Sequence, residues 1–338
     1  MSREEYRTEG LLYESARLSL LELRMIGTER MERLLGSGSM ETCLRYLAEY
    51  GVEIRRDKES GAFLREETLE ARLKAVYEEL FSAVGQPLFL KLWLYPYDCH
   101  NIKAAIKCRQ REIDPREMLF DCGTLSVETV LQAVQSHDYS ALPPLLASAA
   151  EEASQAFAAS GNPQTVDFIL DRACYRAMAE DATESGVPIA AELVRLKIDL
   201  TNLMTAVRLV RMRGNGSVRG LLGEAFLEGG TVSLEDLLLW CGSGEEGLWR
   251  ELRRGAFEKF ALAAGGEEAT LSQIERAADN CMIGAVREAK RAVYGAEMLI
   301  GYLLGGEYEV RNLRILLAGM ELSHSVEAIR ERIRDCYV

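Results

Sequence analysis

One short motif, an acidic residue followed three positions later by asparagine and then by an aliphatic residue, occurs three times in this chain at separations of about one hundred residues. The copies are Asp98-Cys99-His100-Asn101-Ile102, Asp199-Leu200-Thr201-Asn202-Leu203 and Glu309-Val310-Arg311-Asn312-Leu313. Repetition at a long period indicates a repeated structural unit. Because the period exceeds the roughly 34 to 47 residues of two-helix repeats, we expect each copy to be a small multi-helix domain.

Each motif lies within a stripe of apolar residues spaced alternately four and three apart, which predicts a long helix with one buried face. The second copy has the clearest stripe: Ile189, Leu193, Leu196, Leu200, Leu203, Val207 and Val210. The acid and the asparagine lie beside the stripe and share a helix face, since they are three residues apart. Buried polar groups need hydrogen-bond partners. We therefore interpret Asp98, Asn101, Asp199, Asn202, Glu309 and Asn312 as structural polar pairs that fix packing.

Other signals mark where helices begin. Ser39, Ser126 and Ser233 each have an acid two residues later, a pattern typical of a helix N-cap with a favourable first-turn charge. Gly-x-Pro precedes the first two motifs and ends at Pro87 and Pro188, which suit the start of a helix. The third motif lacks this start and begins with glutamate. Proline within the first stripe, at position 96, is expected to kink that helix.

These patterns predict an all-α protein of three pseudo-repeated helical domains, at residues 1–115, 116–222 and 223–338. Breaks are expected near Arg109–Pro115 and at Gly214–Ser217. A content of only 7 prolines and 7% aromatic residues, beside abundant Leu, Ala, Glu and Arg, favours helix over strand.

The net charge of −13 argues against nucleic acid or an anionic lipid surface as a partner, because the protein's potential repels phosphate. The most apolar segments, Pro87–Tyr97 and Met298–Gly306, have about half the length needed to cross a bilayer. The charged first ten residues lack the apolar segment of a signal peptide. We expect a cytoplasmic protein that meets a membrane only through a partner.

The sequence predicts no catalytic residue, no metal ligand and no cofactor. It has no phosphate-binding loop of the type G-x-x-x-x-G-K-[ST]. Its histidines, His100, His137 and His324, have no metal-ligand spacing to one another or to a cysteine. The eight cysteines include no C-x-x-C pair, so we expect reduced thiols. The segment Ser325–Val338 is expected to form a charged amphipathic helix, which either packs on its own repeat or docks a partner.

The three motifs in register resemble those of a known family, the C subunits of V/A-type ATPases and ATP synthases, whose eukaryotic members are called d or AC39-like subunits. The resemblance rests on Tyr97–Lys103 with the basic stretch to Arg109, on Asp199–Leu203, on Tyr308–Leu313 and on the charged segment that ends in Tyr337-Val338.

The resemblance implies a funnel of three helical domains that joins the central stalk of a rotary ATPase to the membrane proteolipid ring. Such a protein transmits torque for ATP-coupled transport of protons or sodium ions and catalyses nothing. Its acidic surface would suit a basic stalk foot or basic loops of the ring. Residues alone leave two other classes open, a cytosolic helical interaction scaffold and an all-helical enzyme with a carboxylate-lined cavity.

Overall fold

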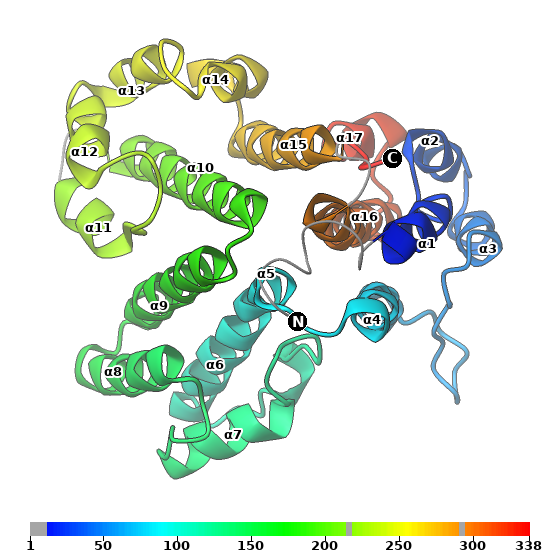
Figure 1. Cartoon of the computed structure of the whole chain (residues 1–338), viewed down its shortest axis with the longest axis horizontal. Coiled ribbons are helices and arrows are strands. Elements are labelled where there is room, and N and C mark those ends of the chain that lie inside the picture. Colours follow the sequence, from blue (N-terminus) through cyan, green and yellow to red (C-terminus); the bar gives the residue numbers. More distant parts are fainter. Residues whose placement is uncertain (1–11, 214–217, 291–294) are drawn as a thin grey trace. The chain divides into compact units, whose positions relative to one another are not determined.

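The regular structure of this chain is helical (Figure 1). The computed structural model describes residues 12–213, 218–290 and 295–338. Within these residues the only β-type contact is an isolated antiparallel bridge between Arg56 and Phe63. The prediction of an all-α protein is confirmed. The loop expected at Gly214–Ser217 lies outside the described residues.

The chain forms two compact units. The first unit comprises residues up to Gln86 together with Trp249–Val338, and the second unit comprises Pro87–Leu248. The chain therefore leaves the first unit once and returns to it. The division into repeats at 1–115, 116–222 and 223–338 remains a prediction.

The first unit is organised around one long buried helix, α16 (Ala296–Glu321), which contacts α1, α3, α4, α15 and α17. Its apolar stripe is buried, with Leu299, Leu303, Leu313 and Leu317 fully inaccessible to solvent. The other elements of this unit are α1 (Leu12–Glu22), α2 (Thr28–Leu35), α3 (Met40–Glu49), α4 (Arg65–Val84), α14 (Glu258–Ala264), η3 (Gly266–Glu268), α15 (Leu271–Ala289) and α17 (Val326–Arg330).

Glycines on α16 let neighbouring elements approach closely. A Cβ atom at Gly306 would lie 2.6 Å from Cγ1 of Val76 on α4, and one at Gly319 would lie 2.6 Å from Cγ1 of Ile329 on α17. Both distances are shorter than van der Waals contact, so only glycine fits at these positions without a shift of the neighbour.

The second unit packs its helices around α9 (Pro163–Glu184), which contacts α6, α8, α10 and α11. Its elements also include α5 (Leu88–Lys91), η1 (Leu92–Leu94), α6 (Tyr95–Gln110), η2 (Arg116–Met118), α7 (Val127–Ser136), α8 (Pro144–Ser160), α10 (Pro188–Arg213), α11 (Val218–Ala225) and α12 (Leu234–Gly242). The boundary between the units falls within α13 (Gly244–Leu252).

The helix-start signals have the expected outcomes. The hydroxyl oxygens of Ser39, Ser126 and Ser233 each accept a hydrogen bond from the main-chain N–H three residues later. Helix α10 begins at Pro188. In the first copy the helix is interrupted by η1, and α6 carries Pro96 in its first turn. Near the predicted kink the backbone stays helical but tightens to the 3-10 turn η1 just before Pro96, whose ring nitrogen has no N–H to bond to the preceding turn.

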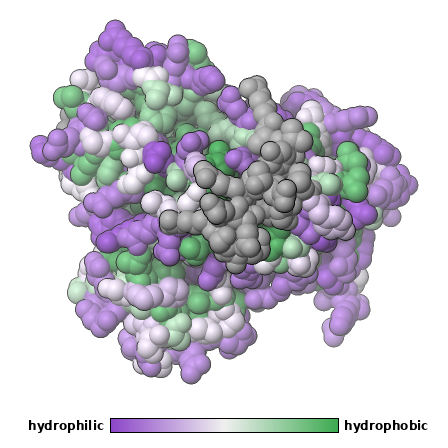
Figure 2. Space-filling view, in the orientation of Figure 1, coloured by the Kyte–Doolittle hydropathy of each residue, from purple (hydrophilic) through white to green (hydrophobic). Residues whose placement is uncertain are grey.

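Hydrophilic residues predominate around the margin of the face in Figure 2, in keeping with the charged composition. In the described part of the chain, no helix combines the length and the apolar character needed to span a bilayer.

Candidate functional site: three buried acid–Asn pairs

The six motif residues are buried polar side chains. We call them pair 1 (Asp98 and Asn101 on α6), pair 2 (Asp199 and Asn202 on α10) and pair 3 (Glu309 and Asn312 on α16). Their exposed fractions range from 0 to 5%. Since an unpaired buried polar group costs about 1–3 kcal/mol, each must have partners.

The three asparagines bind main chain in the same way. The Asn101 amide donates to the carbonyl of Phe120 at 2.8 Å and accepts from its N–H at 2.9 Å. Asn202 makes the same two bonds to Leu227, at 2.8 and 2.9 Å. Asn312 makes them to Arg334, at 3.0 and 2.9 Å. Each asparagine thus holds a segment that lies just beyond the next helical element, which is η2, α11 or α17.

The two aspartates bind the same segments a few residues further on. Asp98 Oδ1 accepts from the N–H of Leu125 at 3.0 Å, and Oδ2 accepts from the hydroxyl of Thr124 at 2.6 Å. Asp199 Oδ1 accepts from the N–H groups of Thr231 and Val232, and Oδ2 accepts from the Thr231 hydroxyl at 2.6 Å. Burial raises the pKa of Asp98, and the hydrogen bonds from Thr124 and Leu125 only partly oppose that shift.

A glycine precedes each threonine, and the structure explains it. A Cβ atom at Gly123 would collide with Oδ1 of Asp98, and one at Gly230 would collide with Oδ1 of Asp199. The matching sequences Gly123-Thr124-Leu125-Ser126 and Gly230-Thr231-Val232-Ser233 are therefore the segments that cover pairs 1 and 2.

Pair 3 has different partners for its acid. Glu309 Oε2 accepts from the N–H of Ile26 at 2.6 Å, and Oε1 accepts from Nε of Arg72 at 2.7 Å. Ile26 is 283 residues away in the sequence. The residue ahead of Ile26 is Met25, whereas a threonine precedes the corresponding residues Leu125 and Val232. Arg72 on α4 provides the side-chain donor that threonine provides in pairs 1 and 2.

The position of Ile26 shows which helix start corresponds to those that follow pairs 1 and 2. Ser126 and Ser233 directly follow the residues whose N–H groups bind the aspartates, and they cap α7 and α12. In pair 3 the corresponding residue is Gly27, which precedes α2. Ser39 caps the next helix, α3, so it is not the counterpart of the other two serines.

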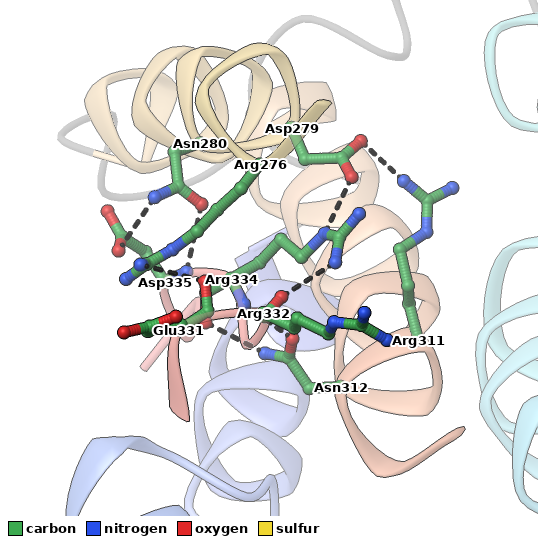
Figure 3. A network of polar contacts seen from close by, with 9 residues as sticks. All are labelled: Arg276, Asp279, Asn280, Arg311, Asn312, Glu331, Arg332, Arg334 and Asp335. Atoms are coloured by element: carbon green, nitrogen blue, oxygen red, sulfur yellow. Dashed lines mark hydrogen bonds and ion pairs between the residues drawn. The ribbon is translucent and has the colours of Figure 1, made fainter. Parts of the chain in front are cut away.

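The segment held by Asn312 carries a further polar network that the sequence analysis missed (Figure 3). Asn280 on α15 donates to Oδ1 of Asp335 and accepts from its N–H, both at 3.0 Å. One carboxylate oxygen of Asp279 accepts a hydrogen bond from Nε of Arg334 at 2.8 Å. The other oxygen accepts a hydrogen bond from Arg311. Nothing in the periodicity of α15 marks these two residues, because their partners are far away in sequence.

The last residues also fill a groove on α16. The Tyr337 ring lies against Gly301 and Gly305, where a Cβ atom would overlap it. Its hydroxyl donates to Glu22 at 2.7 Å, and Glu22 also pairs with Lys290 at 2.6 Å. Arg287 donates to the carbonyls of Cys336 and Tyr337. The four-residue spacing of Gly301 and Gly305 is the sequence signal that could have indicated a close contact on this face of α16.

The segment Ser325–Val338 was expected to form a helix that packs on its own repeat or docks a partner. It packs within the first unit, with Ile329, Ile333, Cys336 and Tyr337 buried. The helix is shorter than predicted, since α17 covers only Val326–Arg330. The main chain beyond it bonds to asparagine side chains in place of a helical turn.

The remaining candidate ligands are dispersed. His100 contacts the carbonyl of Met118, His137 adopts a left-handed conformation at the end of α7, and His324 follows α16. Among the described residues no three His, Cys, Asp or Glu side chains are placed to hold a metal ion. All eight cysteines are free.

The fold and the site define the class of this protein as a helical protein built on repeated acid–Asn pairs. Comparison with known proteins gives its family. Residues 15–332 match the family model described as ATP synthase (C/AC39) subunit. The chain is 23% identical to the C subunit of the V-type sodium ATPase of Enterococcus hirae, over 94% of this chain and 95% of that protein. It is 24% identical to the C subunit of the A-type ATP synthase of Thermococcus kodakarensis, over 96% and 90%.

A third relative, the C subunit of the V-type ATP synthase of Thermus thermophilus, is 26% identical over 67% of this chain and 68% of that protein. Because the family model covers nearly the whole chain, this protein belongs to the ATP synthase (C/AC39) subunit family. It is accordingly a component of a rotary ATPase.

Proposed function

We propose that this chain is the non-catalytic central-stalk component that joins the stalk of a V/A-type ATPase to the membrane proteolipid ring. In this role it transmits torque between ATP turnover and the movement of protons or sodium ions. Its partners are the stalk subunits and the ring, and it lies on the cytoplasmic side, peripheral to the membrane. The observation that carries the proposal is the family match over residues 15–332.

The acid–Asn pairs suit a mechanical role. A torque-bearing protein must resist bending between its helices and the segments that join them. Pair 1 fastens its helix to a later segment through four hydrogen bonds, and pair 2 does so through five. Pair 3 bonds α16 to a later segment through Asn312 and to Ile26 and Arg72 through Glu309. Buried networks whose members are all satisfied rigidify a structure. The arrangement of three such domains as a funnel remains part of the proposal.

The net charge of −13 supports partners with basic surfaces, because complementary charges increase association rates and select among partners. A basic stalk foot or basic loops of the proteolipid ring would meet this condition. Reversing exposed acids should then weaken assembly most strongly at low salt.

A helical scaffold unrelated to ATPases was one of the two alternatives that the residues alone left open. The names of the relatives favour the ATPase component, since both V-type and A-type complexes occur among them.

Affinity purification of the tagged chain from detergent-solubilised native membranes tests the proposal. We expect mass spectrometry to identify proteolipid and central-stalk subunits in the eluate. Membranes from cells lacking the chain should retain ATP hydrolysis by the soluble head and lose ATP-driven ion transport, which the wild-type gene restores. A clean monomer from cells with intact ATPase, or undiminished ion transport in its absence, would support the scaffold instead.

A further inference from the structure

A cavity of about 320 Å³ lies in the first unit between α2, α15, α17 and the segment after α17. Its walls combine apolar side chains with an unusual number of arginines. The apolar residues include Met31, Leu35 and Ile333, and the basic ones are Arg276, Arg287, Arg330 and Arg334. The volume is at the lower end of the range of small-ligand sites, which is about 300–1,000 Å³.

The charge of this cavity is opposite to that of the whole protein. Only two carboxylates, Glu32 and Asp335, line it beside the four arginines. Arg330 pairs with Glu32 at 2.9 Å, and Arg334 pairs with Asp279 outside the lining. The cavity therefore concentrates positive charge on a protein with a net charge of −13.

Two of the four guanidinium groups are not paired with any carboxylate among the described residues. Arg287 donates to the carbonyls of Cys336 and Tyr337, and Arg276 donates through one terminal nitrogen to the carbonyl of Glu331 at 3.1 Å. The cavity thus has more positive charge than its own acids neutralise.

Arg276 has an additional unsatisfied group. Its Nε atom is buried and has no hydrogen-bond partner in the described part of the chain. Figure 3 shows its side chain extending from α15 toward Glu331 and Asp335. Asp335 is itself fixed by both the nitrogen and the oxygen of the Asn280 amide. A buried donor without a partner is unfavourable, so an acceptor at this position would be favourable.

We propose that this cavity binds a small phosphate-bearing anion, with Arg276 as the principal contact and Arg330 as a second one. A guanidinium group presents several N–H donors in a fork that matches phosphate oxygens in a bidentate manner. The small volume fits a free phosphate or a small phosphate ester, and the apolar wall at Met31 and Leu35 would accommodate the body of an ester.

Titration calorimetry of the purified full-length chain with inorganic phosphate tests this inference, at constant ionic strength against chloride. We expect saturable binding with one site and a matching rise of the unfolding temperature, since a ligand of the native state stabilises it. Arg276→Gln should lower the affinity at least tenfold. Arg330→Gln, at an exposed position, should lower it severalfold and provides a test if the first variant fails to fold.

Arg314→Gln is the matched control, because it removes the same charge from α16 outside this cavity and should leave the affinity unchanged. Absence of saturable binding, or equal loss in Arg314→Gln and Arg276→Gln, would overturn the inference. Binding to vesicles that contain phosphatidic acid, without binding of inorganic phosphate, would also overturn it by assigning the site to a lipid surface.

Discussion

The aromatic ring of Tyr337 packs against Gly305 on α16. The side chain of Tyr337 also covers Gly301, four residues earlier on the same helix. Any side chain at Gly305 would overlap the ring atoms of Tyr337, and a Cβ at Gly301 would lie 2.6 Å from its hydroxyl oxygen. The absence of side chains at two positions of α16 is therefore what allows the last residues to pack.

Replacing Gly305 by alanine is expected to destabilise the first unit by about 1–3 kcal/mol, the usual cost of overpacking a well-filled core. Gly284→Ala on α15 is the matched control, since nothing lies within 4 Å of the new Cβ. That control should be neutral or stabilising by about 0.5–1 kcal/mol, because alanine favours helix over glycine. Urea unfolding followed by circular dichroism measures both, and equal effects would contradict the packing argument.

Asn202→Ala should remove two hydrogen bonds and leave both main-chain groups of the buried Leu227 without partners. The expected loss is about 1–3 kcal/mol for each unsatisfied group. Gln155→Ala, at an exposed position on α8, should change the unfolding free energy by less than about 0.5 kcal/mol. If Asn202→Ala were as mild as the control, the structural role of pair 2 would be wrong.

The contribution of Asp98 to the free energy of unfolding should decrease as pH rises. Its pKa is raised by burial, so the native state holds a proton that the unfolded state has already released. Its contribution is therefore greatest below its unfolded-state pKa of about 3.9 and is lost as pH rises through the raised native pKa. Asp98→Asn should remove this part of the pH dependence in denaturant titrations carried out at pH values above about 3.9. An unchanged profile would show that Asp98 does not titrate in that range.

Glu309→Gln should be strongly destabilising, because it removes the carboxylate that Arg72 contacts in a site where the side chains of Arg72 and Glu309 are only 13% and 3% exposed. Breaking a buried pair costs about 3–5 kcal/mol. Adding Arg72→Met should recover part of the loss in a double-mutant cycle.

Glu180→Gln breaks an exposed pair with Arg176, where both side chains are more than half exposed, and should cost at most about 1 kcal/mol. A Glu309→Gln variant no less stable than Glu180→Gln would refute a buried ion pair at pair 3.

Local periodicity was sufficient to predict the helical class, the long striped helices and the three serine caps, because these depend on neighbours within a few residues. It also identified the six pair residues as polar positions on otherwise apolar helices. It could not supply their partners. Ile26 and Arg72 reach Glu309 only after the chain has returned from the second unit, and Asn280 meets Asp335 across 55 residues.

The helix predicted for Ser325–Val338 shows that distant partners can also override a local helical pattern. Its apolar spacing is helical, and the prediction holds for Val326–Arg330. Beyond that point the side chains of Asn312 and Asn280 offer the main chain of Arg334 and Asp335 an alternative set of bonds. Long-range side-chain bonds outweigh a local preference there.

The hydrogen bond between Ile26 and Glu309 also bears on how the protein is made. Residues 12–86 emerge from the ribosome before the whole second unit, whereas their partner helix α16 emerges after it. The second unit is continuous in sequence and can fold while the first unit still lacks its central helix, since domains fold in order of synthesis. A nascent chain that stops before Glu309 therefore exposes the apolar surfaces of α2 and α4, and this makes truncated products natural targets for chaperones and proteases.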